Sequence, residues 1–170
     1  MTLIDDYLEE QIKYENKYGK YTIVLMQVGH FYEAYGVDND DENTNSENMK
    51  NLADIMNIQM TRKNKSITGS SRGNPLMIGV NIYSIDKYIQ ILLNANYTIV
   101  LISQTSEPPY VKREVTNIYS PGTNIEYSTK GNTNNLVSIY LEQVKQHDGN
   151  DILWIGASTV DLSIGKNVVF

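Results

Sequence analysis

The 170-residue sequence has no cysteine, only two histidines and a single tryptophan. The absence of cysteine excludes disulfides, thiolate zinc sites and cysteine nucleophiles, and it fits an intracellular protein of unspecified compartment. With only His30 and His147 available, a histidine-based metal site is disfavoured. The longest aliphatic run, Ile23 to Met26, is about four residues, whereas a spanning helix needs about 20. A membrane span is therefore excluded, and the acidic N-terminus is unlike a secretory signal or a transit peptide.

Basic residues are outnumbered, since 14 Lys and Arg face 20 Asp and Glu, for a net charge of −6. A stand-alone nucleic-acid binder usually has the opposite sign. The charges are also separated along the chain. Residues 38–47 contain acids and no base, and residues 61–73 contain the bases Arg62, Lys63, Lys65 and Arg72 and no acid. Two interpretations stay open: two solvated loops, or a basic segment that faces phosphate.

Helical and extended patterns alternate over the first 120 residues, which predicts an α/β domain. Helices are predicted from Thr2 to near Gly19, from a cap at Ser46, and from a cap at Ser84. Extended segments are predicted at 22–28, 31–35, 58–61, 76–80, 97–103 and 111–119. The residues at 64–75 are rich in Ser, Gly, Asn and Pro, which indicates an exposed loop.

A second region follows a break at Ser120-Pro121-Gly122. The polar stretch 123–135 is typical of an inter-domain linker. A new apolar pattern begins at Leu136, with strands predicted at 152–159 and 160–164 and a tight turn at 165–167. Because a hairpin with one further element buries too little surface to fold alone, we expect the chain to be the N-terminal piece of a longer protein.

Several catalytic motifs are absent. The Gly165-Lys166 pair does not complete a phosphate loop, and neither Gly-x-Gly-x-x-Gly nor Gly-x-Ser-x-Gly occurs. Asp161 lies in a predicted strand and resembles the first carboxylate of a ribonuclease-H-like nuclease. Such a metal site needs several convergent carboxylates, so a lone strand Asp favours an ordinary hydrogen-bonded acid.

One segment stands out, because a buried strand runs into Gly-His-Phe-Tyr-Glu at positions 29–33. On an extended chain Phe31 and Glu33 point to one side and Tyr32 to the other. Alternation alone favours a half-buried strand with Tyr32 inward.

Together with further stretches, this segment resembles the MutS family of DNA mismatch-repair proteins. Gly-x-Phe-Tyr-Glu after an apolar strand is similar to the family's mismatch-recognition motif. Further similar stretches, in order and at matching spacing, are residues 7–18, 56–63, 75–88, 103–104, 113–123, 135–136 and 160–165. The resemblance covers nearly the whole chain.

The resemblance implies a domain organisation. Residues 1–122 would be the mismatch-recognition domain, a mixed β-sheet flanked by helices. Residues 123–135 would be a linker, and 136–170 the start of a connector domain of ribonuclease-H-like fold. No enzyme activity and no cofactor are expected for this chain, since ATP and Mg²⁺ belong to the family's separate ATPase domain. Dimerisation would use C-terminal domains. The residues of the motif look closer to those of divergent members of the family, such as the members from large DNA viruses or mitochondria.

The resemblance also implies the partner, double-stranded DNA with mispairs or small loops and no membrane, and a role for each site residue. Phe31 would wedge into the minor groove and stack on a base of the mispair, with Val28 as support. Glu33 would hydrogen-bond the displaced base, with its protonated form favoured by the anionic surroundings. Leu76 and Met77 would line the groove, and Arg62 and Lys63 would follow the flanking backbone. The alternatives are a partner-interaction module in which Phe31 is ordinary packing, and a metal-dependent nuclease that uses Asp161.

Overall fold

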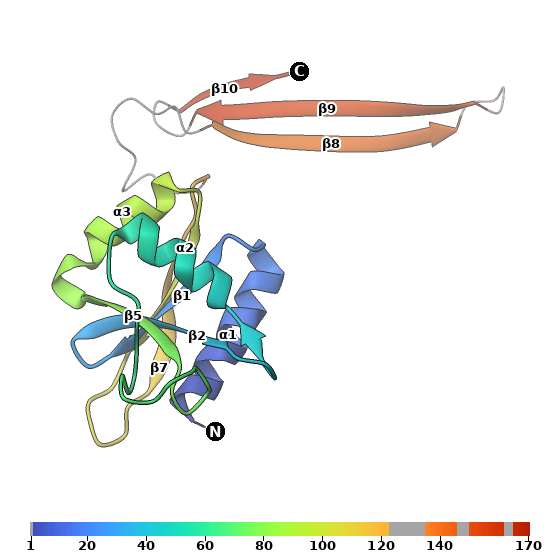
Figure 1. The fold of residues 1–170 in the computed structure, drawn as a ribbon. Coiled ribbons are helices and arrows are strands. Elements are labelled where there is room, and N and C mark those ends of the chain that lie inside the picture. The colour runs from blue at the N-terminus through green and yellow to red at the C-terminus, as the bar shows by residue number, and fades with distance from the viewer. Residues whose placement is uncertain (1, 123–134, 146–149, 162–164) are drawn as a thin grey trace. The chain divides into compact units, whose positions relative to one another are not determined.

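The computed structural model describes residues 2–122, 135–145, 150–161 and 165–170 (Figure 1). It divides into two compact units, Met1–Pro121 and Gly122–Phe170, which we call unit 1 and unit 2. Apart from Asn135, the predicted linker at 123–135 lies outside the described residues. Each unit is described by itself.

Unit 1 is a mixed sheet with helices, as the sequence predicts. Its elements are α1 (Leu3–Tyr18), β1 (Thr22–Val28), β2 (Phe31–Asp38), β3 (Asn43–Thr44), α2 (Ser46–Met56), β4 (Thr61–Arg62), β5 (Leu76–Asn81), the 3₁₀ turn η1 (Ile82–Ser84), α3 (Ile85–Asn94), β6 (Thr98–Gln104) and β7 (Arg113–Tyr119). The strand order is β4-β5-β2-β1-β6-β7, with β3 paired to β2. Strands β1 and β6 are parallel and the other pairs are antiparallel, so the predicted mixed sheet is confirmed.

The helices lie on both faces of this sheet (Figure 1). Successive residues of a strand point to opposite faces. On β2, the ring of Tyr35 packs edge-to-face on Tyr7 of α1, with ring centroids 5.1 Å apart. The next residue, Gly36, leaves room for Met49 of α2, since a Cβ at Gly36 would lie 3.0 Å from the Met49 Cγ. Therefore α1 covers the face that carries Tyr35, and α2 covers the opposite face together with α3, which contacts it.

The predicted start of α1 is confirmed in detail. The hydroxyl of Thr2 accepts from the Asp5 N–H at 3.2 Å, and the Asp5 carboxylate accepts from the Thr2 N–H at 3.0 Å. This reciprocal capping satisfies two backbone donors that the first helical turn leaves without a partner. It fixes where α1 begins, and therefore which of its residues face the sheet.

Strands β1 and β2 pair over only three residues, Met26–Val28 with Phe31–Glu33, and then separate. The fully buried Gln11 of α1 bridges the freed backbone of β1. Its amide nitrogen donates to the Thr22 carbonyl and its oxygen accepts from the Val24 N–H, both at 2.9 Å. Because a buried polar group without partners is costly, this pairing explains how a glutamine is tolerated in the core.

Other boundaries differ from the prediction. The N-cap of α2 is Asn45, in a left-handed conformation, and the hydroxyl of Ser46 instead donates to Asn43 at 2.7 Å. The strand predicted at 58–61 is reduced to β4, because only Thr61 and Arg62 pair with β5. Among the described residues, no helix is long and apolar enough to cross a bilayer.

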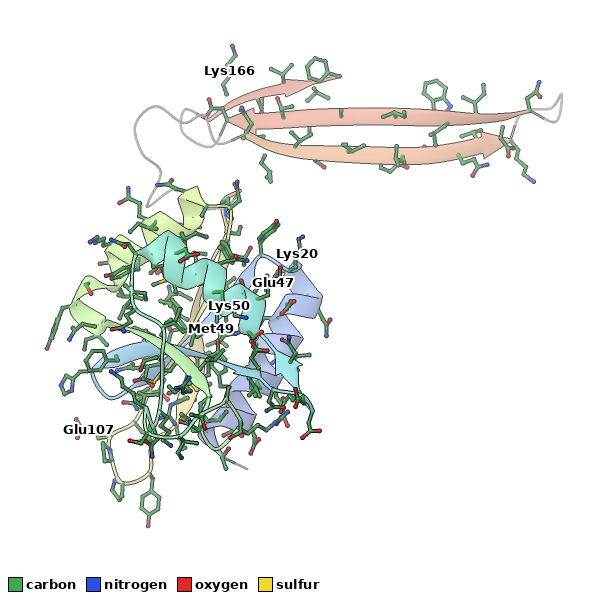
Figure 2. All side chains as sticks on the ribbon, viewed as in Figure 1. Lys20, Glu47, Met49, Lys50, Glu107 and Lys166 are labelled. Carbon is green, nitrogen blue, oxygen red and sulfur yellow. The ribbon has the colours of Figure 1, made fainter. Side chains whose placement is uncertain are left out.

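Unit 2 is a three-stranded antiparallel sheet of β8 (Asn135–Lys145), β9 (Asp151–Asp161) and β10 (Lys166–Val169), in the order β10-β9-β8. Strand β9 is continuous where two strands were predicted, and residues 162–164 lie outside the described part. Side chains project from both faces of the β8–β9 ribbon (Figure 2). Its large apolar residues are exposed, including Trp154 and Ile155, each at 64%.

Candidate nucleic-acid interface

Phe31 begins β2 directly after a two-residue turn. Val28 and Phe31 are register partners, so Gly29 and His30 alone make the turn. Gly29 has a φ of +59°, a conformation that glycine adopts without steric cost and that suits hairpin turns. The ring of Phe31 is 46% exposed, although Phe31 pairs with β1 on one side and with Asn81 of β5 on the other. A rigid strand end therefore presents an apolar ring to solvent.

The turn is fastened to the neighbouring strands by side chains. Arg113 of β7 donates from Nε to the Gln27 carbonyl, and the Gln27 side-chain oxygen accepts from the Gln104 N–H, both at 2.9 Å. With its amide oriented to satisfy both groups, Gln104 accepts from the Gly29 N–H at 3.3 Å and from Arg113 at 3.2 Å. These bonds restrict the turn that carries Phe31.

The alternation predicted for β2 is confirmed. The hydroxyl of Tyr32 lies 2.7 Å from the Ser103 hydroxyl, and Tyr32 is 9% exposed. Phe31, Glu33 and Tyr35 occupy the alternate positions and share the face covered by α1. Along this row exposure falls from the half-exposed Phe31 through the partly exposed Glu33 to Tyr35 at 3%.

Glu33 and Tyr35 are hydrogen-bonded to each other. The Tyr35 hydroxyl donates to the Glu33 carboxylate. Burial, followed by the bond to Glu33 and its negative charge, raises the pKa of Tyr35 well above its ordinary value. Tyr35 therefore stays protonated and remains a donor. Across the strand pair, the missing side chain of Gly79 makes room for Glu33, because a Cβ at Gly79 would lie 3.4 Å from the Glu33 Cγ.

The predicted groove residues separate into two groups. Val28 is partly exposed and pairs directly with Phe31. Met77 is partly exposed and is the register partner of Tyr35, so it shares that face. Leu76 pairs with Gly36, is 9% exposed and points to the opposite face. The structure thus brings Val28 and Met77 to the face of Phe31, and it does not bring Leu76 there.

Arg62 and Lys63 lie at the outer edge of the sheet. Arg62 of β4 pairs with Leu76, and its Nε is buried with no hydrogen-bond partner in the part of the chain that is described. It lines a shallow pocket of about 280 Å³ with Lys65 and Thr61. Lys63 is exposed. By strand rise and spacing, Arg62 is about 20 Å from Phe31, which equals about six base-pair steps of duplex.

Arg72, the last base of the predicted basic segment, is engaged by acids. Its guanidinium forms ion pairs with Asp5 and Glu42, each at 2.9 Å. The Thr2 backbone bond, with Arg72 as the second cause, lowers the pKa of Asp5 to about 2. Arg72 itself is the main cause of the lowered pKa of Glu42. The acidic and basic segments are therefore joined here, and the bases left for phosphate in this segment are Arg62, Lys63 and Lys65.

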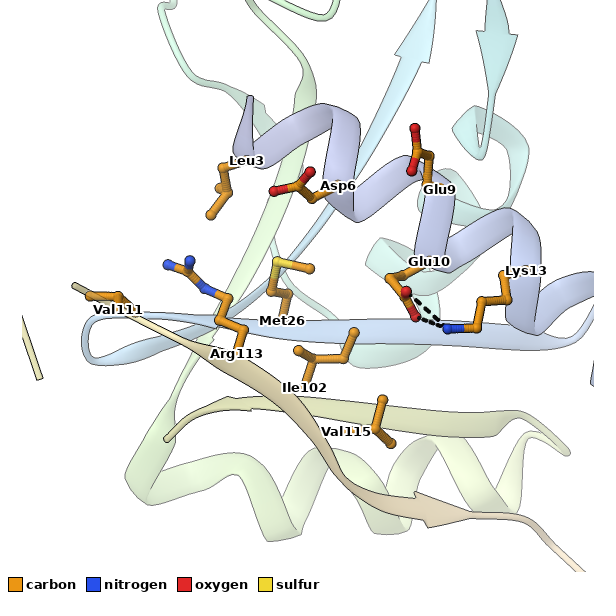
Figure 3. Close-up of a pocket in the computed structure, with 10 residues that line it drawn as sticks. All are labelled: Leu3, Asp6, Glu9, Glu10, Lys13, Met26, Ile102, Val111, Arg113 and Val115. Atoms are coloured by element: carbon orange, nitrogen blue, oxygen red, sulfur yellow. Dashed lines mark hydrogen bonds and ion pairs between the residues drawn. The ribbon is translucent and has the colours of Figure 1, made fainter. Parts of the chain in front are cut away.

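A cleft of about 430 Å³ lies between α1 and strands β1, β6 and β7 (Figure 3). Met26, Ile102 and Val115 form an apolar floor, and Arg113 extends from β7 toward the start of α1, where Leu3 and Asp6 lie. Met26 is the register partner of Glu33, so the cleft opens on the face that carries Phe31 and Glu33. The positive charge of Arg113 acts against the rise in the pKa of Tyr35 that burial and Glu33 cause.

Two groups that the sequence suggested for other chemistry can also be located. His30 is exposed in the turn, and its carbonyl accepts from the Ile82 N–H at 3.0 Å. Asp161 ends β9. Within residues 2–122, 135–145, 150–161 and 165–170, no group of three or more His, Asp or Glu side chains is placed to hold a metal ion.

Sequence reasoning missed three residues of this interface: Tyr35, Gln104 and Arg113. The alternation that placed Glu33 beside Phe31 also places Tyr35 two residues further on the same side, so this signal was present. Gln104 and Arg113 belong to strands that follow Phe31 by more than 70 residues. Only the strand order β2-β1-β6-β7 brings them to the turn.

The chain is similar to known proteins over most of its length. Residues 8–128 match the family model for MutS domain I. A mutS homolog of Acanthamoeba polyphaga mimivirus, named as a DNA mismatch repair protein, is 35% identical over 99% of this chain and 15% of its own length. The DNA mismatch repair protein MutS of Thermotoga petrophila is 26% identical over 82% of this chain and 16% of its own length. The DNA mismatch repair protein MutS of Streptococcus pneumoniae is 33% identical over 70% of this chain and 13% of its own length.

The chain thus spans about one sixth or less of the length of these relatives. The family model matches well over half of the chain. The matched segment contains the turn, the row Phe31, Glu33 and Tyr35, and the basic residues Arg62 and Lys63. The chain therefore belongs to the MutS family.

Proposed function

We propose that unit 1 binds mispaired double-stranded DNA and that the chain acts in DNA mismatch repair, without catalysis of its own. The observation that carries this proposal is the half-exposed ring of Phe31 on a turn held by β1, β5 and the Gln104–Arg113 bonds. A ring buried in the core could not reach DNA. The names of the relatives, all DNA mismatch repair proteins, support the same role.

The energetics favour selection of weak sites in the duplex. Inserting an apolar side chain between base steps costs a few kcal/mol of unstacking and kinks the duplex. Stacking of one base on an aromatic ring returns about 1–3 kcal/mol. At a Watson–Crick step these terms roughly cancel, whereas a mispair has already lost part of its pairing and stacking. Phe31 would therefore read deformability rather than base identity.

Glu33 and the basic residues Arg62 and Lys63 would have separate tasks. The Glu33 carboxylate lies on the face of Phe31, where a base edge displaced by the wedge would meet it. Arg62 and Lys63, about 20 Å away, would contact phosphates of the flanking duplex. With a net charge of −6, the counterion-release contribution is small, so we expect weak binding that strengthens at low salt.

The test is substitution of Phe31 by Ala, with Tyr21→Ala as the matched control. Tyr21 is also a half-exposed aromatic, at 53%, but it precedes the other end of β1. Dissociation constants for duplexes with and without one mispair would be measured at low salt, by anisotropy or by NMR shift titration where binding is weak. We expect Phe31→Ala to reduce the preference for the mispair about 5- to 100-fold, the equivalent of one stacked base.

Tyr21→Ala should leave the preference unchanged. If Phe31→Ala folds as the parent chain does and keeps the full mispair preference, the wedge mechanism is wrong. That result would favour the alternative in which this unit serves partner interaction.

A further inference from the structure

We propose that Tyr35 is a positioning residue that orients the Glu33 carboxylate for base recognition. This inference rests on the proposed function, because it assigns a role to the same site. Tyr35 itself is 3% exposed and does not reach DNA, so it acts through Glu33.

Tyr35 is held at both its backbone and its ring. Its carbonyl accepts from the Asn45 side-chain amide at 2.8 Å. Its ring packs edge-to-face on Tyr7, whose hydroxyl donates to the Val24 carbonyl at 3.0 Å. The ring held in this way places its hydroxyl against the Glu33 carboxylate, to which it donates. A flexible glutamate is thereby tied to a rigid anchor.

The bond leaves half of the carboxylate free. Tyr35 occupies the Oε2 oxygen of Glu33, and no partner for Oε1 is found among the residues that the structure describes. The neighbour across the strands is the exposed Gly79, which adds no side chain above Glu33. One oxygen is therefore oriented by the protein, and the other has no hydrogen-bond partner among the described residues and is available to a base edge.

The first arm of the test uses the free 170-residue chain and needs no DNA. Tyr35→Phe removes one hydroxyl and keeps the buried ring, and Tyr32→Phe is the control that removes a hydroxyl facing the other side. Three-bond NMR couplings in the side chain of residue 33 report whether it keeps a single rotamer. In Tyr35→Phe we expect these couplings to move toward the values averaged over several rotamers, and in Tyr32→Phe to stay as in the parent chain.

The second arm measures mispair preference at low salt. Tyr35→Phe should lower the preference about 2- to 10-fold, the equivalent of one hydrogen bond. In a Glu33→Gln background the same substitution should cost nothing further, since its effect passes through the carboxylate. A purely structural role would instead give equal losses in both backgrounds.

The outcomes separate the two proposals. Unchanged couplings of residue 33, an unchanged preference in Tyr35→Phe, or an equal effect of Tyr32→Phe each overturns the role of Tyr35. If the couplings change while Phe31→Ala has no effect on the preference, the wedge mechanism fails and only the orientation of Glu33 by Tyr35 stands.

Discussion

The two units have similar strands and opposite burial. In β1 the five residues Thr22–Met26 are all buried, and in β6 the four residues Ile99–Ile102 are all buried as well. In β8 all eleven residues are exposed, although the strand is rich in Leu, Val and Ile. Local pattern is enough to predict a strand in both units. Burial requires a further layer of structure, which α1 on one face and α2 with α3 on the other supply in unit 1.

The pattern in unit 2 also indicates which layers it lacks. Adjacent residues such as Ile139 and Tyr140 point to opposite faces, and they are 64% and 62% exposed. Strands that are apolar on both sides are typical of sheets covered on both faces. This agrees with the expected start of a connector domain, which stays a prediction. Unit 1 should therefore carry the stability of the chain.

The largest effect should come from a core residue of unit 1. Ile99 and Ile155 are both isoleucines on interior strands, and they are 0% and 64% exposed. Ile99→Ala should lower the free energy of unfolding by about 2–5 kcal/mol, because it removes buried methyl groups and leaves a cavity. Ile155→Ala should change it by less than about 0.5 kcal/mol. Urea unfolding followed by circular dichroism measures the free energy of unfolding of both variants. Equal decreases would contradict the difference in burial between the two units.

The comparison also shows where prediction from sequence succeeds. Helix starts with a capping pattern, buried β-branched strands and the side to which Phe31 points all follow from local rules, as Thr2, Thr22–Val28 and Phe31 illustrate. The contribution of Arg113 to the turn does not, because 86 residues separate it from Gln27. The ion pairs of the basic segment could not be predicted either, because they join distant parts of the chain. Local charge left open whether residues 61–73 face solvent or phosphate, and the fold pairs Arg72 with Asp5 and Glu42.

A smaller effect should come from these exposed ion pairs of unit 1. The folded state lowers the pKa of Asp5 from 3.8 to about 2. A depressed carboxyl pKa stabilises the fold above the ordinary value, and this contribution is lost as the pH falls through about 2. Arg72→Ala should therefore lower the unfolding temperature slightly at pH 6, with a difference from the parent chain that shrinks between pH 4 and pH 2.

Lys65→Ala is the control for Arg72→Ala, because Lys65 is a base of the same loop without an ion pair in the described residues. Differential scanning calorimetry at several pH values would compare the three proteins. A difference for Arg72→Ala that stays constant down to pH 2 would show that its effect does not depend on the charges of Asp5 and Glu42.

Removal of residues 122–170 should have the smallest effect on the unfolding temperature of unit 1, although it is the largest change to the chain. Because unit 1 has its own core, the shortened chain should unfold at the same temperature by circular dichroism.

Trp154, the single tryptophan, lies in unit 2 and is 64% exposed. In the whole chain its fluorescence should therefore resemble that of a solvated indole throughout the unfolding transition of unit 1. The shortened chain should also bind much less of a dye that reports exposed apolar surface, since more than half of the exposed large apolar residues in the described part of the chain lie in unit 2. A marked fall in the unfolding temperature of the shortened chain would instead mean that unit 2 stabilises unit 1, and the contrast between the two would no longer hold.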